Sequence, residues 1–579
     1  MTLTASKRLE LGASAHGGET HFRVWAPNAG EAVARIIGRG DFPLDRDQHG
    51  VFSATLPARA GDRYFYILDG GTPIPDPVSR LLPEGVHGPT EIVDPEAFPW
   101  NDHTWKGLDF RDYILYELHV GTFTSSGTFD GVIEKLPYLK SLGVTAVELM
   151  PVAANPGKRN WGYDAVSPYA VQENYGGPEG LRRLVDAAHR AGLAVVIDVI
   201  YNHLGNEGNY LQQFGPYFTD KHQTPWGEAI NYDQPGCERV REYVRENALY
   251  WIREYHADGL RLDATQTIKD DSPRHVVAEI AAAVHRLEAE LGRMVTVVAE
   301  TDENDARYLR RREEGGFGVD GVWSDDFHHA VHALLTGENK GYYGDFAGKP
   351  ELLARVLNEG FGYQGEPFAF WKGKPRGSST DGIPLYRHVI CTQNHDQVGN
   401  RAQGERLNPL VVSYGARKVA AAILLLAPHT PLLFMGQEYD EANPFQFFTD
   451  YGDPVLQEAV REGRRSEFAD FAWDEVPDPQ DSKTFERSRL SWIGGGNHGE
   501  MLDWYRQLIS LRKRVVISSE RTCRAQWNNG VLRMELPAHD ARLLLVAAFR
   551  TTSPEPGDGW ERAIWMERDG YSVGVYRRK

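Results

Sequence analysis

The feature that most constrains the fold is a repeated alternation of short apolar runs with longer amphipathic stretches between residues 113 and 439. The eight candidate strands are 113–123, 146–152, 194–200, 259–264, 295–300, 321–327, 388–396 and 431–439. The segments between them carry apolar residues at helical spacing. Eight parallel strands, each followed by a helix, close into a (β/α)8 barrel. We therefore predict an α/β fold built around such a TIM barrel.

The chain on either side of this barrel has the pattern of β-structure. Within residues 1–108, alternating runs such as 21–25 and 64–68 are separated by turn residues, which predicts a small β-sandwich. After about residue 510 short runs return, and they predict a small C-terminal β-domain. We therefore predict three domains: 1–108, a catalytic barrel over 109–510 with long loop insertions, and 511–579.

Two kinds of local signal add detail to the barrel. Ser272 and Pro273 form an N-cap and first-turn pair for the helix before the fifth strand, and Gly292 lies where a left-handed residue would end it. Residues 204–235 and 336–384 are too long for ordinary loops. We expect both segments to lie over the mouth of the barrel.

Charge and cysteine usage limit the partners and the compartment. With 63 basic and 81 acidic residues the net charge is −18 and no basic run stands out, which argues against a nucleic-acid or anionic-membrane partner. Cys237, Cys391 and Cys523 are widely spaced, which indicates reduced thiols rather than disulfides or a thiolate metal site. The first residues contain no apolar leader, and the longest apolar region, 419–435, is interrupted by two prolines. We expect a cytoplasmic protein.

Acidic residues cluster at the carboxyl ends of four predicted strands. The third strand contains Asp198 near its end, the fourth Asp263, the fifth ends at Glu300 and the seventh at Asp396. Barrel enzymes carry their active sites at this end of the strands. Neighbouring carboxylates raise one another's pKa, which is a cost to stability that a purely structural arrangement would avoid. The sequence therefore predicts an active site on this rim.

Two chemistries use such a cluster, and the sequence favours one of them. Metal-assisted transfer needs ligands grouped around an ion, and the four acidic strand ends carry no H-x-x-x-H pair that would supply them. Glycoside chemistry needs one nucleophilic carboxylate and one acid of raised pKa, together with aromatic rings on which sugars pack. The candidate rings are Tyr116, Trp161, Tyr163 and Tyr201.

The four strand ends resemble the four sequence regions of the α-amylase superfamily, glycoside hydrolase family 13, in the expected order. The resemblance covers the barrel. It implies that Asp263 is the nucleophile, that Glu300 is the general acid/base and that Asp396 binds sugar hydroxyls and stabilises the transition state. The substrate-binding residues it implies are Tyr163, Asp164, His203, Arg261, Asn394, His395 and Gln397. Such enzymes are retaining, so the carboxyls of Asp263 and Glu300 should lie about 5–5.5 Å apart.

Motifs outside these regions narrow the resemblance. The N-terminal motifs 22–27 and 75–77 resemble the immunoglobulin-like accessory sandwich of branching, debranching and trehalohydrolase enzymes. The stretches 394–401, 444–450 and 461–468 resemble the maltooligosyltrehalose trehalohydrolase family. This implies hydrolysis of the α-1,4 bond next to the terminal α,α-trehalose unit of maltooligosyl trehalose, releasing trehalose for trehalose biosynthesis. A maltooligosyltrehalose synthase is the implied pathway partner.

The same resemblance leaves some points open. The chain has Gln266 and Thr267 where amylases often have a basic residue and His, so contacts on the leaving-group side are not carried over. A calcium-binding domain after the third strand is not evident, so we expect no cofactor and no required metal. The alternatives are a glycogen branching or debranching enzyme and a non-catalytic amylase-like binding protein. The crowding of three acids disfavours the latter, because a binder gains nothing from it.

Overall fold

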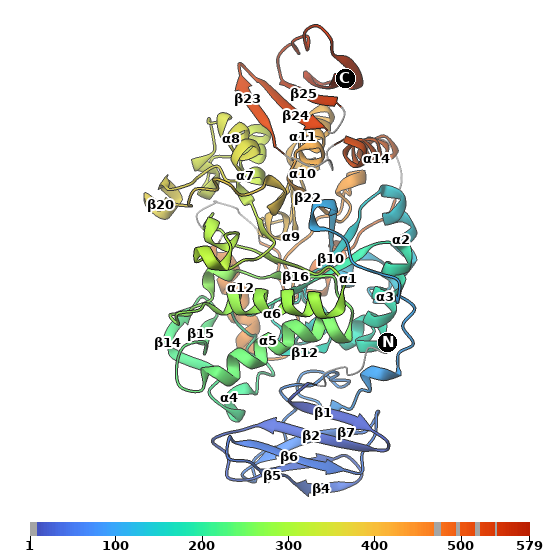
Figure 1. Ribbon diagram of the computed structural model, residues 1–579, viewed down its shortest axis with the longest axis vertical. Coiled ribbons are helices and arrows are strands. Elements are labelled where there is room, and N and C mark those ends of the chain that lie inside the picture. The colour runs from blue at the N-terminus through green and yellow to red at the C-terminus, as the bar shows by residue number, and fades with distance from the viewer. Residues whose placement is uncertain (1–8, 468–475, 494–497, 516–521, 539–540, 579) are drawn as a thin grey trace.

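The centre of the molecule is a closed barrel of eight parallel strands (Figure 1). The computed structural model describes residues 9–467, 476–493, 498–515, 522–538 and 541–578. In barrel order the strands are β9 (Leu115–Leu118), β10 (Ala146–Leu149), β13 (Ala194–Val199), β16 (Gly259–Leu262), β17 (Thr296–Ala299), β18 (Gly321–Trp323), β21 (His388–Cys391) and β22 (Thr430–Phe434). All eight predicted strands are confirmed. Each strand is shorter than the run that predicted it, because residues at the ends of the run lie in loops or helices.

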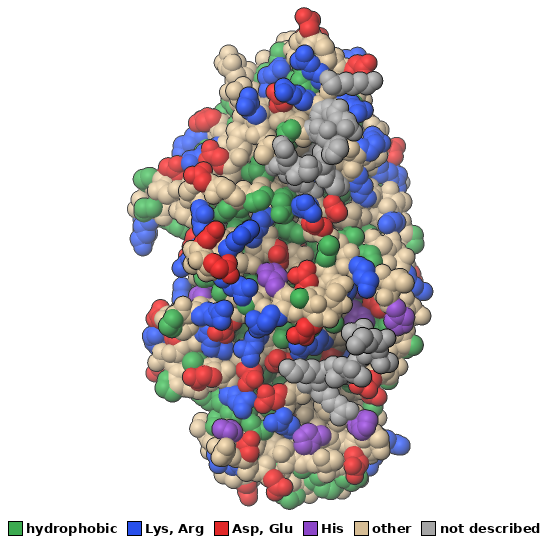
Figure 2. Space-filling model, viewed as in Figure 1, with side chains coloured by type: hydrophobic (Ala, Val, Ile, Leu, Met, Phe, Trp, Pro, Cys, Tyr) green, Lys and Arg blue, Asp and Glu red, His purple; other side chains and the backbone are tan. Residues whose placement is uncertain are grey.

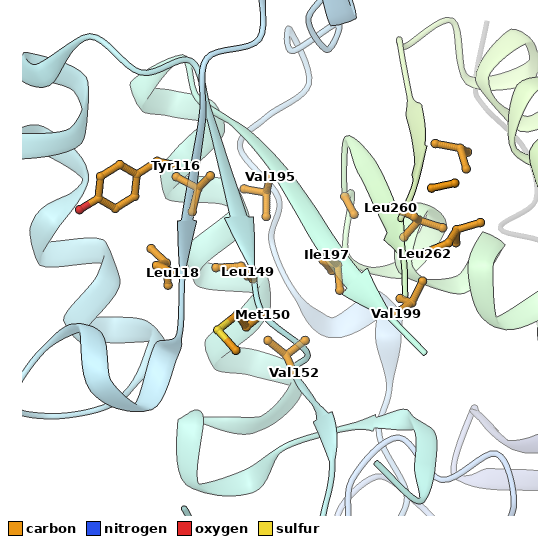
Figure 3. Close-up of a cluster of buried hydrophobic side chains, with 14 of the residues drawn as sticks. Tyr116, Leu118, Leu149, Met150, Val152, Val195, Ile197, Val199, Leu260 and Leu262 are labelled. Atoms are coloured by element: carbon orange, nitrogen blue, oxygen red, sulfur yellow. The ribbon is translucent and has the colours of Figure 1, made fainter. Parts of the chain in front are cut away.

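Helices of the barrel region connect the strands and cover them. The longer ones are α2 (Phe129–Leu142), α3 (Gly177–Ala191), α5 (Cys237–Glu254), α6 (Val276–Leu291), α7 (Asp325–Thr336), α8 (Glu351–Glu359), α11 (Tyr414–Leu426), α12 (Pro454–Glu467) and α14 (His498–Val515). Strand side chains such as Tyr116, Leu149, Ile197 and Leu260 belong to the large buried hydrophobic cluster (Figure 3). Because side chains alternate along a strand, their neighbours must point into the barrel.

The interior of the barrel changes from apolar to charged along its axis. A separate buried cluster fills the amino-terminal half, and its strand members are Leu115, Ala146, Ala194, Val196, Val298, Trp323, Val389, Cys391 and Leu432. Two residues further along four of these strands, at the next inward position, are Glu117, Glu148, Asp198 and Glu300. Glu117 lies opposite Glu148 across β9 and β10, and Asp198 lies opposite Arg261 across β13 and β16. The charged layer therefore lies directly below the rim where the sequence predicts the active site.

The N-terminal region is a β-sandwich, as predicted. One antiparallel sheet contains β1 (Gly12–His16), β2 (Glu19–Trp25), β6 (Val51–Leu56) and β5 (Asp45–Arg46), and the other contains β4 (Gly40–Pro43), β3 (Ala32–Ile36), β7 (Arg63–Leu68) and β8 (Thr90–Glu91). The rings of Phe22 and Tyr64, from the two sheets, meet edge to face with centroids 4.8 Å apart. Figure 1 shows the sandwich at one end of the molecule and the C-terminal sheet at the other.

The segment between sandwich and barrel is held against the amino end of the barrel. Trp105 Nε1 donates to Asp258 Oδ1 at 2.7 Å, and the Trp100 ring stacks on His256 with centroids 3.7 Å apart. His189 bridges two carboxylates there, with Nδ1 2.9 Å from Asp102 Oδ2 and Nε2 2.8 Å from Asp258 Oδ2. This buried ionic network joins the linker to α3 and to the start of β16.

The C-terminal region is one antiparallel sheet in the order β23-β24-β25-β27-β26. Its strands are β23 (Arg524–Asn528), β24 (Val531–Ala538), β25 (Ala541–Phe549), β26 (Glu561–Arg568) and β27 (Tyr571–Arg578). Helix α11 packs against this sheet so closely that a Cβ on Gly415 would lie 2.1 Å from the Arg568 carbonyl oxygen. Helix α14 continues through residue 510, where the sequence places the domain boundary.

Two local predictions need correction. Helix α6 begins at Val276 with His275 as N-cap, not at Ser272, because Ser272 Oγ is engaged by Arg241 Nη1 at 3.0 Å and bonds Asp270. Gly292 does end this helix, with φ 60°.

The second correction concerns segment 336–384, which does not lie wholly over the barrel mouth. It contains α8, whose Asn358 exchanges two hydrogen bonds with the main chain of Ala525 in β23, at 2.7 and 2.9 Å. Residues 366–376 form the hairpin β19 (Glu366–Phe368) and β20 (Lys374–Arg376). Residues 204–235 contain α4 (Leu211–Phe214) and the hairpin β14 (Phe218–Thr224) and β15 (Gly227–Ile230).

The surface agrees with the mixed charge of the sequence. Figure 2 shows acidic and basic side chains interspersed over the visible face, with hydrophobic side chains in small groups. Among the described residues, no helix is long and apolar enough to cross a membrane.

Candidate active site

Arg261 is the centre of the charged layer at the carboxyl end of the barrel. It is fully buried, and its Nη1 donates to Asp263 Oδ1 at 2.7 Å and to both oxygens of Asp198 at 3.0 and 2.9 Å. Its Nη2 lies 3.0 Å from Glu300 Oε2. One guanidinium therefore joins carboxylates from the third, fourth and fifth barrel strands, and its planar set of donors suits this arrangement.

Glu300 is the acid whose proton affinity is most changed by the site. Burial raises the pKa of Glu300 well above the ordinary value, Asp263 and Asp396 raise it further, and Arg261 opposes the shift. Its Oε2 also accepts the main-chain N–H of Ala264 at 2.6 Å. Ala264 has a φ of 37°, a strained value for a residue with a side chain.

Asp396 lies at the start of the short helix α9 (His395–Gly399) and is one-third exposed. His395 Nε2 lies 3.4 Å from Asp396 Oδ1, and Asn400 Nδ2 donates to the same oxygen at 3.2 Å. Asn394, 1% exposed, caps the helix by accepting the Gln397 N–H at 2.8 Å. Asn394 and Gln397 thus lie beside the turn that directs Asp396.

The predicted ring Tyr163 lies across this site. Its ring stacks on His395 with centroids 5.1 Å apart, and its hydroxyl donates to Asp198 Oδ2 at 2.7 Å. Burial raises the pKa of Asp198, and the Arg261 guanidinium opposes that shift. Asp164, the next residue, accepts from Asn160 Nδ2 at 2.7 Å.

His203 borders the same site from the third strand. Its Nε2 is 3.0 Å from the Tyr163 carbonyl oxygen, and burial lowers its pKa below the ordinary value. The ring stacks on Trp226, whose ring lies 4.1 Å away at 11°. Trp226 is at the tip of the β14–β15 hairpin and 42% exposed. The hairpin therefore places an accessible indole beside a predicted substrate-binding histidine.

Three of the four candidate rings are buried and not available as platforms. Tyr116 is fully buried and bonds Glu438, with its hydroxyl 3.1 Å from Oε1, and Tyr201 is buried and donates to Asn247 Oδ1 at 2.8 Å. Trp161 is also buried, and its indole N–H donates to the Gln446 carbonyl oxygen at 2.9 Å. Tyr116 faces outward because it alternates with the inward-facing Glu117 on β9.

The three family-specific motifs meet behind Asp396. Arg464, in the third motif, donates to the Gly399 carbonyl oxygen at 2.6 Å and to Asn400 Oδ1 at 3.1 Å, both in the first motif. Its guanidinium lies over the ring of Phe447, in the second motif, 4.7 Å from the centroid. Residue 468, the last of the third motif, is outside the described residues. The motifs thus support one turn, although they are far apart in sequence.

Sequence reasoning missed the two glutamates of the charged layer, Glu117 and Glu148. Both are 1% exposed. Burial raises the pKa of Glu148 well above the ordinary value and the charge of Glu117 adds to this. A usable signal existed: each is an acid two residues after an inward-facing apolar residue of a strand, Leu115 or Ala146.

A group of possible metal ligands lies outside this site. His222, Asp233 and Asp271 could together contact an ion. Lys221 Nζ, however, lies 2.8 Å from Asp233 Oδ2 and 3.0 Å from Asp271 Oδ2. An ammonium group thus supplies the positive charge at these carboxylates.

Comparisons with known proteins agree with this geometry. The model of the α-amylase catalytic domain matches residues 101–226. A crystal structure of a putative α-amylase from Salmonella typhimurium superposes with a TM-score of 0.91 and 40% identity, over 98% of this chain and 100% of that one. Barrel, carboxylates and family match define a glycosidase of the α-amylase class.

The relatives in sequence specify the family within this class. Malto-oligosyltrehalose trehalohydrolase from Saccharolobus solfataricus is 47% identical over 501 residues, covering 86% of each chain. The chain belongs to the malto-oligosyltrehalose trehalohydrolase family. A 1,4-alpha-glucan branching enzyme from Corynebacterium jeikeium is 30% identical over only 55% of this chain and 50% of its own.

Proposed function

We propose that the protein hydrolyses the α-1,4-glucosidic bond next to the terminal α,α-trehalose unit of maltooligosyl trehalose and releases trehalose. The choice of substrate is supported by 47% identity over most of the chain to a relative that carries the trehalohydrolase name. The chemistry is supported by one observation above all, the joining of Asp263 and Glu300 by Arg261. A retaining glycosidase needs two such carboxyls, one ionised and one protonated.

In the first step of the proposed reaction, Glu300 is the general acid. Its raised pKa keeps a proton on the carboxyl near neutral pH, and that proton passes to the leaving glucosidic oxygen. Asp263 attacks the anomeric carbon and forms the covalent glycosyl-enzyme. The Nη1 contact of Arg261 fixes the orientation of Asp263.

In the second step Glu300, now ionised, takes a proton from water, and the activated water cleaves the ester to Asp263. We assign Asp396 to hydroxyls of the reacting sugar, together with His395 and His203. Tyr163 would pack against the sugar ring. These roles are the ones that the resemblance to the α-amylase superfamily implies, and the shared rim position of the residues supports them.

A product assay tests the substrate. Maltooligosyl trehalose and a plain maltooligosaccharide of equal length are incubated with the protein, and the products are separated. Trehalose from the first, with little glucose or maltose from the second, is the expected result. New α-1,6 links would instead identify a branching enzyme, and binding without turnover would identify a non-catalytic protein.

Two variants test the assigned roles. Asp263→Asn should abolish hydrolysis with a native circular dichroism spectrum, and activity retained at wild-type level would exclude Asp263 as the nucleophile. Glu300→Gln should lose hydrolysis of the natural substrate but still release about one equivalent of fluoride per active site from a maltooligosyl fluoride, since fluoride leaves without a proton donor while the second step still needs Glu300 as base. Loss of this initial burst of fluoride would contradict the acid role.

The proposed substrate also implies a supplier and a compartment. An enzyme that converts the reducing end of a maltooligosaccharide into an α,α-1,1 linkage, a maltooligosyltrehalose synthase, must act before this one. Trehalose should form from plain maltooligosaccharide only when both proteins are present. We assign the reaction to the cytoplasm, which agrees with three cysteines that form no disulfide.

A further inference from the structure

Glu117, on the first barrel strand, contacts the active-site turn without lying at its surface. Its side chain is 2% exposed. Oε1 lies 2.5 Å from His395 Nδ1, and Oε2 accepts the main-chain N–H of His395 at 3.0 Å. One carboxylate therefore holds both the ring and the backbone of the residue that precedes Asp396.

The hydrogen bonds around His395 determine its protonation. Tyr163 has a single hydroxyl proton and donates it to Asp198, so the Tyr163 oxygen, 2.7 Å from His395 Nε2, must accept a proton from the ring. An ionised carboxylate only accepts, so with Glu117 as the acceptor at 2.5 Å Nδ1 donates as well. Both ring nitrogens carry hydrogen, and the ring is an imidazolium.

We propose that Glu117 is a positioning residue, which holds His395 doubly protonated and fixes its ring beside Asp396. The ring nitrogen is 3.4 Å from Asp396 Oδ1, so its positive charge attracts and orients the Asp396 carboxyl group. Although burial lowers it, Asp396 and Glu117 raise the pKa of His395 to about 9, which agrees with the geometry. Where the proposal concerns reaction rates, it rests on the proposed function.

Titratable or charged groups face His395 from every element around it. They are Glu117 on β9, His119 after β9, Glu148 on β10, Tyr163 before β12 (Ser167–Val171), Asp198 on β13, Arg261 on β16 and Asp396 on α9. Burial raises the pKa of Glu148 well above its ordinary value and so favours its neutral form, and burial lowers the pKa of His119 to about 4. Glu117 is thus the only one of these acids that bonds a ring nitrogen of His395 directly.

The charge of His395 can be measured on the full-length protein without substrate. Histidine labelled with 15N on the ring distinguishes a nitrogen that carries hydrogen from one that does not, and the His395→Gln variant assigns the resonance by its loss. The wild type should show two protonated ring nitrogens from pH 6 to about pH 8. A neutral ring at pH 7.5 overturns the proposal, whatever substrate the enzyme is found to cleave.

Glu117→Gln tests whether Glu117 is the residue that keeps His395 doubly protonated, and Glu148→Gln is the matched control. In the first variant an amide NH2 group replaces one accepting oxygen and faces a donor of His395, so the ring should become neutral at pH 7.5. In the second a neutral amide replaces a neutral acid on the adjacent strand, so the His395 resonances should not move. Glu117→Asp should restore the double protonation in part. Two protonated nitrogens in Glu117→Gln at pH 8 would refute the role of Glu117.

The pH dependence of kcat/KM distinguishes the positioning role of Glu117 from a purely structural one. Glu117→Gln should lower kcat/KM about 10- to 100-fold at pH 7.5, the range found when partners of functional groups are removed. The loss should shrink toward pH 5.5, because the ring is then protonated in both proteins. An equal loss at every pH would show that Glu117 merely stabilises the barrel, and would overturn the proposal.

Discussion

The Arg261 Nη1 atom lies 2.7 Å from Asp263 Oδ1, and the two residues face the same interior because Asp263 directly follows β16, two positions after Arg261. This contact orients the proposed nucleophile from below. Arg261 is buried together with Asp198 and approaches Glu300, so it also neutralises a group of acids that could not share this space alone.

Arg261→Ala should therefore damage both catalysis and stability. Removing one partner from a buried ionic group costs about 3–5 kcal/mol of unfolding free energy, because the remaining charges stay buried. Urea unfolding measures this loss. Arg261→Lys should retain part of the stability but lose at least about 100-fold in kcat, because one ammonium cannot bridge three carboxylates. Wild-type kcat in Arg261→Lys would show that the orientation of Asp263 does not matter.

The pKa of Glu300 should control the alkaline side of the activity profile. Burial raises the pKa of Glu300 well above its ordinary value, and kcat/KM should fall as the pH rises through that pKa and the proton is lost. Asp396→Asn removes a negative charge that raises this pKa, so the alkaline limb should move to lower pH. Glu303→Gln, three residues after Glu300, is the control and should leave the alkaline limb unchanged. An unchanged limb in Asp396→Asn would contradict the coupling.

His189, between Asp102 and Asp258, should make stability depend on pH. Although burial opposes it, the two carboxylates raise the pKa of His189 above the ordinary value of about 6.5. Its contribution to the unfolding free energy should be complete below about pH 6.5 and be lost as the pH rises through the folded-state pKa. Each pH unit between the unfolded-state and folded-state pKa values corresponds to about 1.4 kcal/mol.

Urea midpoints at several pH values between 6 and 9 measure this dependence. His189→Gln should flatten the decline, and the exposed control His49→Gln should keep it. A decline of equal size in His189→Gln would assign the effect to another group.

The Trp226 indole should contribute to binding rather than to folding. It stacks on His203 and is 42% exposed, so Trp226→Ala removes accessible aromatic surface from a hairpin tip. We expect KM for maltooligosyl trehalose to rise about tenfold, which corresponds to about 1.4 kcal/mol, with little change in the melting temperature. Trp565→Ala, at another exposed tryptophan in β26, is the control. Equal KM values in both variants would exclude Trp226 from the binding surface.

The family-specific motifs show what a local sequence pattern can and cannot predict. Each motif was recognisable in the sequence, but nothing in it predicted that Arg464 would bond Asn400, 64 residues earlier, which in turn bonds Asp396. Asn394 and Gln397 are a second example. Both were identified in the sequence, but the hydrogen bond from the Gln397 N–H to Asn394 that caps α9 depends on the backbone turn after β21.

The sequence by itself determined the eight strands and the acidic rim, because the apolar period and the position of an acid at a strand end are local properties. It also determined the family resemblance. Only the tertiary structure decided what lies beneath the rim: the pairing of Glu117 with His395, the charged layer around Arg261 and the burial of Tyr116. These depend on barrel closure, which brings β9 next to β22 and close to β21, and on which face of each strand turns inward. The pKa shifts arise from burial and from charges on distant segments, so they exist only once the barrel has closed.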